Sequence, residues 1–355
     1  MKNKILIPYL QALLAAALFG ASAPLSKLLL GEVDTILLAA LLYLGCGIGV
    51  LIFKLIRGIA IPKQEIEAGL SAKDLPWLLG SILAGGVAAP IILMYSLKST
   101  PAATASLLLN FECVATSILA FLIFHEAVGS RIWAGLFLIT LSGILLTLNF
   151  SGEWGFSPGA LGIIIACSLW GLDNNFTRNI SAKDPLLTVI WKGLAAGSTS
   201  MVIYLAAAGF KMPQIGMIAC SLTLGFLSYG FSIILFILAL RNLGAARTSA
   251  VFGIAPFAGA LISFALFNDP LNLLFWVSLP VMLAGTYMLL LESHGHSHHH
   301  KWMSHDHRHR HDDGHHDHQH EGVETGDLEH SHQHQHSENE HSHPHTPDDH
   351  HRHEH

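Results

Sequence analysis

Charged side chains are scarce in this sequence, and their scarcity excludes an ordinary soluble protein. Only 12% of the 355 residues are Asp, Glu, Lys or Arg, whereas 51% are hydrophobic. A soluble chain usually carries about 25% charged residues. The charges are also unevenly placed, because residues 292–355 hold 14 of the 25 acidic residues and 24 of the 25 histidines. The chain therefore consists of an apolar body followed by a polar, His-rich tail.

Cysteine is scarce as well, and several catalytic motifs are missing. The four cysteines each lie inside an apolar run without metal or redox spacing, which argues against a disulfide framework or a Cys-based zinc site. The sequence has no phosphate-binding loop, and His125-Glu126 is not followed by a second histidine at zinc-protease spacing. We therefore do not expect an enzyme or an ATP-driven pump. We also expect that the protein requires no cofactor and has no nucleic-acid partner.

Long apolar runs are what the body does contain. A helix needs about 20 apolar residues to cross the bilayer core, and backbone groups in lipid must be satisfied within the helix. Ten such runs predict an all-α polytopic membrane protein of ten transmembrane helices, with the lipid bilayer as its surroundings. The expected spans are 7–30, 35–53, 75–97, 103–124, 132–150, 160–180, 186–209, 214–240, 248–267 and 272–291.

The ten runs form two similar halves. Residues 95–133, shifted by 143 positions, align with 238–276 without a gap, and Trp133 then falls on Trp276. A second match, at a shift of 151, joins the first helices of the two halves. Because five is an odd number, the second copy enters the membrane in the opposite orientation. Such inverted repeats are typical of secondary transporters.

The repeat and the basic residues together predict domains and orientation. The expected domains are a first five-helix repeat at 1–150, a second at 151–292, and a disordered cytoplasmic tail at 293–355. With ten spans, eleven Lys and Arg residues in the loops and near the span ends gather on one side of the membrane and three on the other. By the positive-inside rule, both termini are expected in the cytoplasm of a protein in the cell membrane. The sequence leaves a homodimer open.

A set of short motifs recurs around the third and fourth spans. Tyr95-Ser96-Leu97 is followed by the alanine-rich start of the fourth span, Pro101-Ala102-Ala103-Thr104-Ala105, and by His125-Glu126 at its end. The second half has Gly244-Ala245-Ala246, with Asp269 at the glutamate position. The pattern resembles the drug/metabolite transporter superfamily, specifically its EamA-type repeat, over about residues 1–291. The resemblance implies gradient-coupled transport or exchange of small organic solutes, often outward.

Three charged residues and one asparagine stand out inside the predicted spans. Glu112 is near the middle of the fourth span, Asp173 and Asn174 are in the sixth, and Lys192 is in the seventh. A charge at the bilayer centre costs about 2.5–3.5 kcal/mol on insertion scales, so each is a candidate for the translocation site. In one interpretation, Glu112 or Asp173 binds a proton or a cationic group and Lys192 contributes the opposing charge. In the other, a carboxylate pairs with Lys192 and joins two helices.

Aromatic residues in the spans are further candidates. Trp170, one turn before Asp173, is the aromatic residue that we place at the translocation site. The alternative for every such residue is packing or contact with lipid. The remaining candidates for lining a cavity are Phe19, Tyr43, Tyr95, Phe111 and Trp191.

The tail has a strong chemical pattern. Histidine recurs as His-x-His among Asp and Glu residues, and imidazole is a preferred ligand of Ni²⁺, Co²⁺ and Zn²⁺. A segment so polar and repetitive cannot build a core, so we expect it to be disordered without metal. The candidate metal ligands are His294, His296, His298, His305, His307, His309, His311, His330, His332, His334 and His336.

Three functions remain open from the sequence. The leading hypothesis is a secondary transporter that exports a small solute by alternating access and carries a metal-binding cytoplasmic tail. The second is an efflux transporter of a divalent metal, Ni²⁺, Co²⁺ or Zn²⁺. The third, of another class, is a metal-responsive membrane sensor without transport. The inverted repeat and the charges within the spans favour transport.

Overall fold

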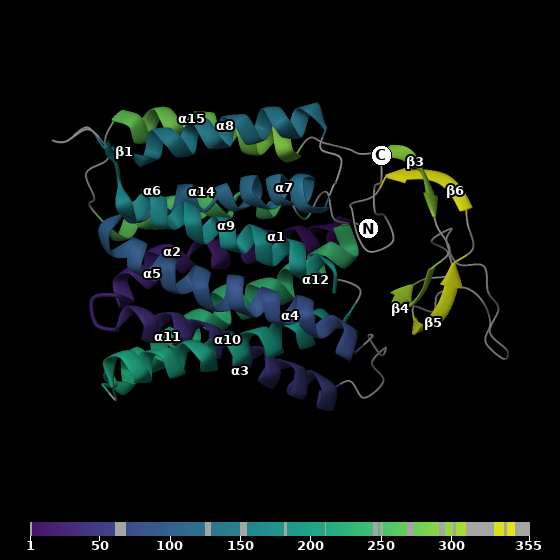
Figure 1. The fold of residues 1–355 in the computed structure, drawn as a ribbon, viewed down its shortest axis with the longest axis horizontal. Helices are drawn as coiled ribbons and strands as arrows, with labels where there is room; N and C mark the ends of the chain where they lie inside the picture. The colour runs from purple at the N-terminus through teal and green to yellow at the C-terminus, as the bar shows by residue number, and fades with distance from the viewer. Residues whose placement is uncertain are drawn as a thin grey trace.

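The structure is a computed structural model, and it forms a helical body with short strands in the tail (Figure 1). It describes residues 2–60, 69–124, 129–149, 155–180, 183–209, 211–243, 248, 251–267, 273–290, 295–300, 303–309, 330–336 and 339–344. Figure 1 places the beginning of α1 (Lys2–Gly20) and the tail strands at the same end of the body. This arrangement agrees with an even number of spans.

The first five predicted spans each correspond to one or more helices. The first three are α1 with α2 (Ser22–Leu29), then α3 (Thr35–Ala60), then α4 (Leu75–Ser81) with η2 (Ile82–Ala88) and α5 (Ala89–Ser99). A short 3₁₀ turn, η1 (Ala72–Asp74), precedes α4. The next two are α6 (Ala102–Leu108) with α7 (Phe111–Phe124), and α8 (Ser130–Thr147).

The second five spans repeat this order. They are α9 (Pro158–Arg178), α10 (Pro185–Ala208), then α11 (Ile215–Gly225) with η3 (Phe226–Phe231) and α12 (Ser232–Leu243), then α14 (Ala255–Leu266) and α15 (Leu273–Leu290). Between the two halves, β1 (Leu148–Asn149) pairs with β2 (Gly155–Phe156). Both η2 and η3 are π-helical turns inside otherwise α-helical spans.

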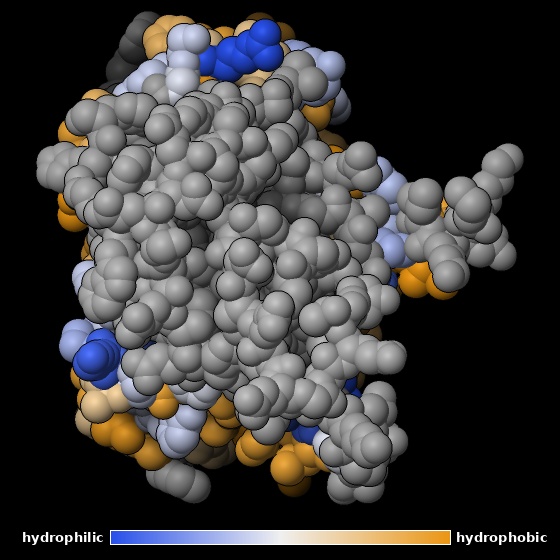
Figure 2. All heavy atoms as spheres, turned by 90° about the vertical axis from the view of Figure 1, so that its right-hand side faces the viewer, coloured by the Kyte–Doolittle hydropathy of each residue, from blue (hydrophilic) through white to orange (hydrophobic). Residues whose placement is uncertain are grey.

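The helices have the length and surface of membrane spans. Within the described residues, seven helices are long and apolar enough to cross a membrane, and α9, α14 and α15 fill the remaining predicted positions. Large apolar side chains face outward, such as Phe137, Leu261 and Leu273, which are 67%, 68% and 77% exposed. Figure 2 shows hydrophobic residues, in orange, along the lower flank of the body. The predicted all-α membrane fold is confirmed.

Two glycines, one in α3 and one in α10, make equivalent contacts where these helices cross. A Cβ added at Gly47 would lie 2.6 Å from the backbone nitrogen of Leu194, and one added at Gly197 would lie 2.6 Å from that of Leu44. Both the glycines and the leucines are separated by 150 residues. Because only glycine permits such close backbones, α3 and α10 cross at a contact that each repeat provides equally.

Short strands lie in the described part of the tail. β3 (Gly295–His300) pairs antiparallel with β6 (Asn339–Pro344), and β4 (Met303–His309) pairs with β5 (His330–His336). In these strands the His-x-His pattern places alternate histidines on one face. The predicted ligands His294 and His311 lie outside the described residues.

Candidate functional site

Asp173 and Lys192 form a buried ion pair between α9 and α10. The Lys192 ammonium donates to Oδ2 of Asp173, and the two side chains are 20% and 4% exposed. Oδ1 accepts from the Ser81 hydroxyl at 2.5 Å and from the Thr177 hydroxyl at 3.1 Å. The Asp173 carboxylate is therefore both neutralised and hydrogen-bonded. This is the second of the two sequence interpretations, in which a carboxylate pairs with Lys192 and joins helices.

The π-helical turn η2 packs against this pair through Gly85. A Cβ added at Gly85 would lie 1.9 Å from Oδ2 of Asp173, so any side chain here would displace the carboxylate. The Gly85 carbonyl accepts from the Trp170 indole at 2.9 Å and from the Tyr43 hydroxyl at 2.6 Å. Trp170, which was predicted to line the site, is 8% exposed and is bonded to the η2 backbone.

Glu112 lies where the fourth span is interrupted. α6 ends at Leu108 and α7 begins at Phe111, which puts Glu112 in the first turn of a helix in the middle of the span. A carboxylate is favoured at a helix N-terminus by the helix dipole. At a shift of 143 residues, Glu112 aligns with Ala255, the first residue of α14. Both repeats therefore start a helix at this depth.

The surroundings of Glu112 differ from those of Asp173. The Asn174 amide donates to Oε1 of Glu112 at 2.8 Å and to the Thr116 hydroxyl at 3.1 Å. Glu112 is half-buried and Asn174 is exposed. Among the described residues, no Lys or Arg side chain forms an ion pair with Glu112. With Asp173 balanced by Lys192, Glu112 gives this region a net negative charge when ionised.

The predicted aromatic candidates separate into two groups. The Phe19 ring meets the Tyr229 ring edge-on at 6.1 Å between centroids, and Tyr43 stacks on Tyr229 at 5.8 Å. Tyr95 and Trp191 are instead 53% and 55% exposed. Trp191 faces an apolar groove between α3 and α10 rather than the buried polar residues.

Phe111 and the cysteines complete the comparison with the predicted residues. Phe111 packs against the main apolar core. Cys46 and Cys167 are buried, as small apolar residues should be, whereas Cys113 and Cys220 are exposed on the helical surface.

Sequence reasoning missed Ser81, Gly85, Thr116 and Tyr229. No local pattern distinguishes these small or aromatic residues from ordinary packing residues. Gly85 belongs to the small-residue run Ala84-Gly85-Gly86, which indicates close helix approach without saying which helix comes close.

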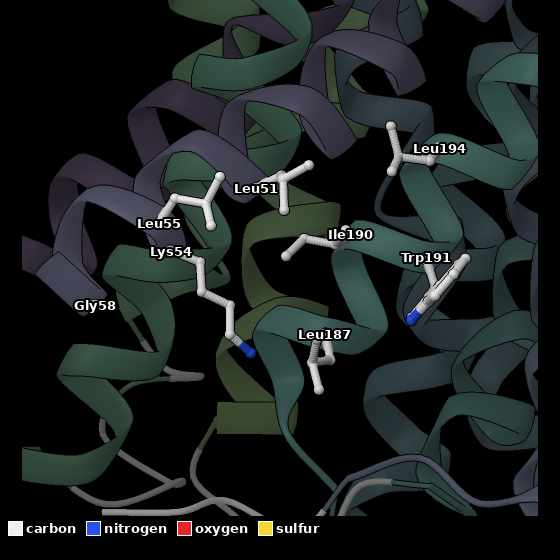
Figure 3. A pocket seen from close by; sticks show the side chains of 8 residues that line it. All are labelled: Leu51, Lys54, Leu55, Gly58, Leu187, Ile190, Trp191 and Leu194. Carbon is white, nitrogen blue, oxygen red and sulfur yellow. The ribbon is translucent and has the colours of Figure 1, made fainter. Parts of the chain in front are cut away.

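A second feature lies apart from these polar residues. An apolar groove of about 610 Å³ opens between α3 and α10 (Figure 3). Its walls include Leu51, Leu55, Ile190 and Trp191, and among the described residues Lys54 is the charged one that lines it. The Lys54 ammonium is 2.5 Å from Oδ2 of Asp184, the residue that caps the N-terminus of α10. The groove has the character of a lipid-facing surface rather than of a polar solute site.

Metal-ligating side chains do not gather in the described part of the helical body. Among the side chains that the structure describes, no three His, Cys, Asp or Glu residues lie close enough together to hold a metal ion. Glu112 instead accepts from the Asn174 amide, which also donates to the Thr116 hydroxyl. Such a set suits a proton or an organic group.

The fold and the polar residues within the spans define a class of protein: a multi-pass membrane transporter built from two similar halves. The chain belongs to the EamA-like transporter family, which it matches over residues 6–148 and 157–291. The resemblance seen in the short motifs is thereby confirmed, and with it the drug/metabolite transporter superfamily.

Individual relatives agree with this assignment. The chain is 27% identical over 296 residues to an uncharacterized transporter of Methanothermobacter thermautotrophicus, a match that covers 79% of this chain and 85% of the relative. A crystal structure of a protein with 17% identity superposes with a TM-score of 0.55 and covers 81% of this chain and 96% of its own. That likeness concerns the fold alone.

Proposed function

We propose that this protein is a secondary transporter that exports a small solute by alternating access, with Glu112 at its translocation site. The observation that carries the proposal is the position of Glu112. It is a partly accessible carboxylate without a cationic partner among the described residues, in the first turn of an interrupted helix. Discontinuous helices at mid-membrane are where transporters of the inverted-repeat kind place their sites.

The polar residues around Glu112 have different roles in the proposed transport step. The Asp173–Lys192 pair holds α9 and α10 together and adds no net charge, so the charge of the region depends on Glu112. Glu112 binds a proton or the cationic group of a solute, and Asn174 orients the carboxylate through its amide. Exchange of the proton for the solute keeps the buried charge balanced while the two repeats change their orientation. This step requires no further ion.

The direction rests on the charge distribution. The asymmetry of eleven to three Lys and Arg residues supports cytoplasmic termini in the cell membrane. The tail then lies on the cytoplasmic side, where it suits the collection of ions rather than their release. Export is therefore the direction that we propose.

A second candidate is favoured by the strand register of the tail. In the ladder of β4 and β5, His305 is opposite His334, His307 is opposite His332, and His309 is opposite His330. Because alternate residues of a strand belong to one face, all six positions fall on the same face of the ladder. Paired histidine positions support binding of Ni²⁺, Co²⁺ or Zn²⁺ by the tail, and through it the alternative of divalent-metal efflux.

The third candidate, a metal sensor without transport, makes a different prediction. A sensor needs the tail but has no use for a mid-membrane carboxylate. Substituting Glu112 therefore distinguishes a sensor from both transport functions.

The experiment is a tolerance panel. Strains that express the wild-type protein or Glu112→Gln at equal membrane levels are grown with Ni²⁺, Co²⁺ and Zn²⁺ salts and with toxic small metabolites. Transport predicts a compound whose tolerance rises with the wild type and not with Glu112→Gln. Glu32→Gln, which changes a carboxylate in an exposed turn, is the matched control and should behave as the wild type does. Equal tolerance in all three strains for every compound that the wild type affects contradicts the role of Glu112.

A further inference from the structure

The two π-helical turns occupy equivalent positions in the repeats. Residues 82–88 of η2, moved forward by the repeat shift of 143, become residues 225–231, and η3 spans 226–231. A π-helical turn is rare and frequently marks a functional position, because the wider turn disturbs the regular hydrogen-bond ladder. Two such turns at matched positions are a property of the repeated unit.

Tyr43 contacts both turns. It lies in the middle of α3 and is 7% exposed. Its hydroxyl donates to the Gly85 carbonyl of η2 at 2.6 Å. Its ring stacks on Tyr229 of η3, with 5.8 Å between centroids and 25° between planes. One side chain thus joins the π turn of the first repeat to that of the second through a hydrogen bond and a ring contact.

The η2 end of this connection reaches the charged pair. The backbone of Gly85 packs directly against the Asp173 carboxylate. The same Gly85 carbonyl also accepts from Trp170 of α9. A movement of η2 therefore changes the surroundings of the Asp173–Lys192 ion pair, and Tyr43 connects η3 to the same Gly85 carbonyl.

We propose that Tyr43 is a positioning residue that couples the two π turns, so that η2 and η3 open and close together. In alternating access the two repeats change conformation in a concerted way, and the use of the coupling for transport rests on the proposed function. The coupling itself is a property of the fold. Because a coupling free energy is reciprocal, a perturbation of either turn must be felt at the other.

Hydrogen–deuterium exchange measured by mass spectrometry tests the coupling without a solute. The full-length protein is placed in lipid nanodiscs as wild type, Tyr43→Phe and Tyr229→Leu. Tyr43→Phe removes the hydroxyl that reaches η2 and keeps the ring that stacks on η3. Tyr204→Phe is the matched control, because Tyr204 is a 2% exposed tyrosine whose hydroxyl donates to the Lys211 carbonyl, away from both turns.

The expected result is that each of the two variants raises the exchange rate in both π turns. Tyr43→Phe should raise the exchange rate of residues 82–88 about fivefold, the ratio for one neutral hydrogen bond, and should also raise that of residues 226–231. Tyr229→Leu should raise both rates too, although its stacking contact is with Tyr43, on α3. Tyr204→Phe should change neither segment.

Two results would overturn the proposal. One is that each variant speeds exchange only in the turn that it contacts, which is the outcome of local packing alone. The other is that Tyr204→Phe speeds exchange in both turns equally, which is the outcome of general loosening. Because no transport is measured, failure of the coupling and failure of the proposed transport function are seen separately.

Discussion

At the scale of single residues, two carboxylates near one another have different surroundings. Asp173 receives an ammonium and two hydroxyls, whereas Glu112 receives an amide and is partly accessible. The sequence predicted that both lie within spans, because each interrupts an apolar run. It could not say which of them pairs with Lys192, since that choice depends on how α9 faces α10 and α4.

The ion pair predicts an asymmetric effect on stability. Lys192→Met should lower the free energy of unfolding by about 3 kcal/mol, because it leaves a buried carboxylate without its counter-charge. Adding Asp173→Asn to the same chain should recover most of that loss. Thermal unfolding in detergent, followed by size-exclusion chromatography, measures both. If Lys192→Met alone is as stable as the wild type, the pair does not hold the helices together.

At the scale of elements, the spans were predictable and their interruptions were not. Each predicted span contains described helix, because hydrophobic length alone specifies a crossing helix. The break before Phe111 and the π turns η2 and η3 carry no such signal. They follow from how neighbouring helices pack, which a single sequence does not display.

The crossing of α3 and α10 predicts strict glycine requirements. Gly47→Leu should strongly reduce the amount of folded protein, because a side chain there meets the α10 backbone. Gly58→Leu on the same helix should be tolerated, since no atom of the described residues lies within 4 Å of a Cβ at that position. Fluorescence-detected chromatography of the two variants compares them. Equal yields would contradict the close crossing.

The strand register of the tail predicts that histidine position matters as well as number. Exchanging Asp306 with His307, and Arg308 with His309, keeps the composition and moves two histidines to the other face of the ladder. Calorimetric titration of the full-length protein with Ni²⁺ should then find fewer bound ions than for the wild type. Unchanged binding would mean that only histidine density counts.

At the scale of the whole molecule, the body and the tail differ in composition, because the body is apolar and the tail is polar and rich in histidine. The apolar body supplies the fold of the EamA-like family, and the match to that family ends at residue 291. The fold was predictable because ten apolar runs and an internal repeat leave few arrangements. The solute was not, because one carboxylate with amide and hydroxyl neighbours fits many small molecules.

Removal of residues 293–355 should leave the body folded, because none of the tail residues that the structure describes belongs to its core. The truncated protein should elute as the full-length protein does and should lose most of its Ni²⁺ binding. If metal is the exported solute, tolerance should persist at a weaker level. Aggregation of the truncated protein would contradict the separation of body and tail.

The central claim is that Glu112 carries the proton or solute during transport. The most direct measurement is uptake of the solute found in the tolerance panel into inverted membrane vesicles, over a range of pH. Wild type and Glu32→Gln should show the same uptake, and Glu112→Gln should lose at least about tenfold at every pH, the loss expected when a charge-assisted contact worth about 1.5–3 kcal/mol is removed. Uptake by Glu112→Gln at the wild-type rate across the whole pH range would contradict the claim.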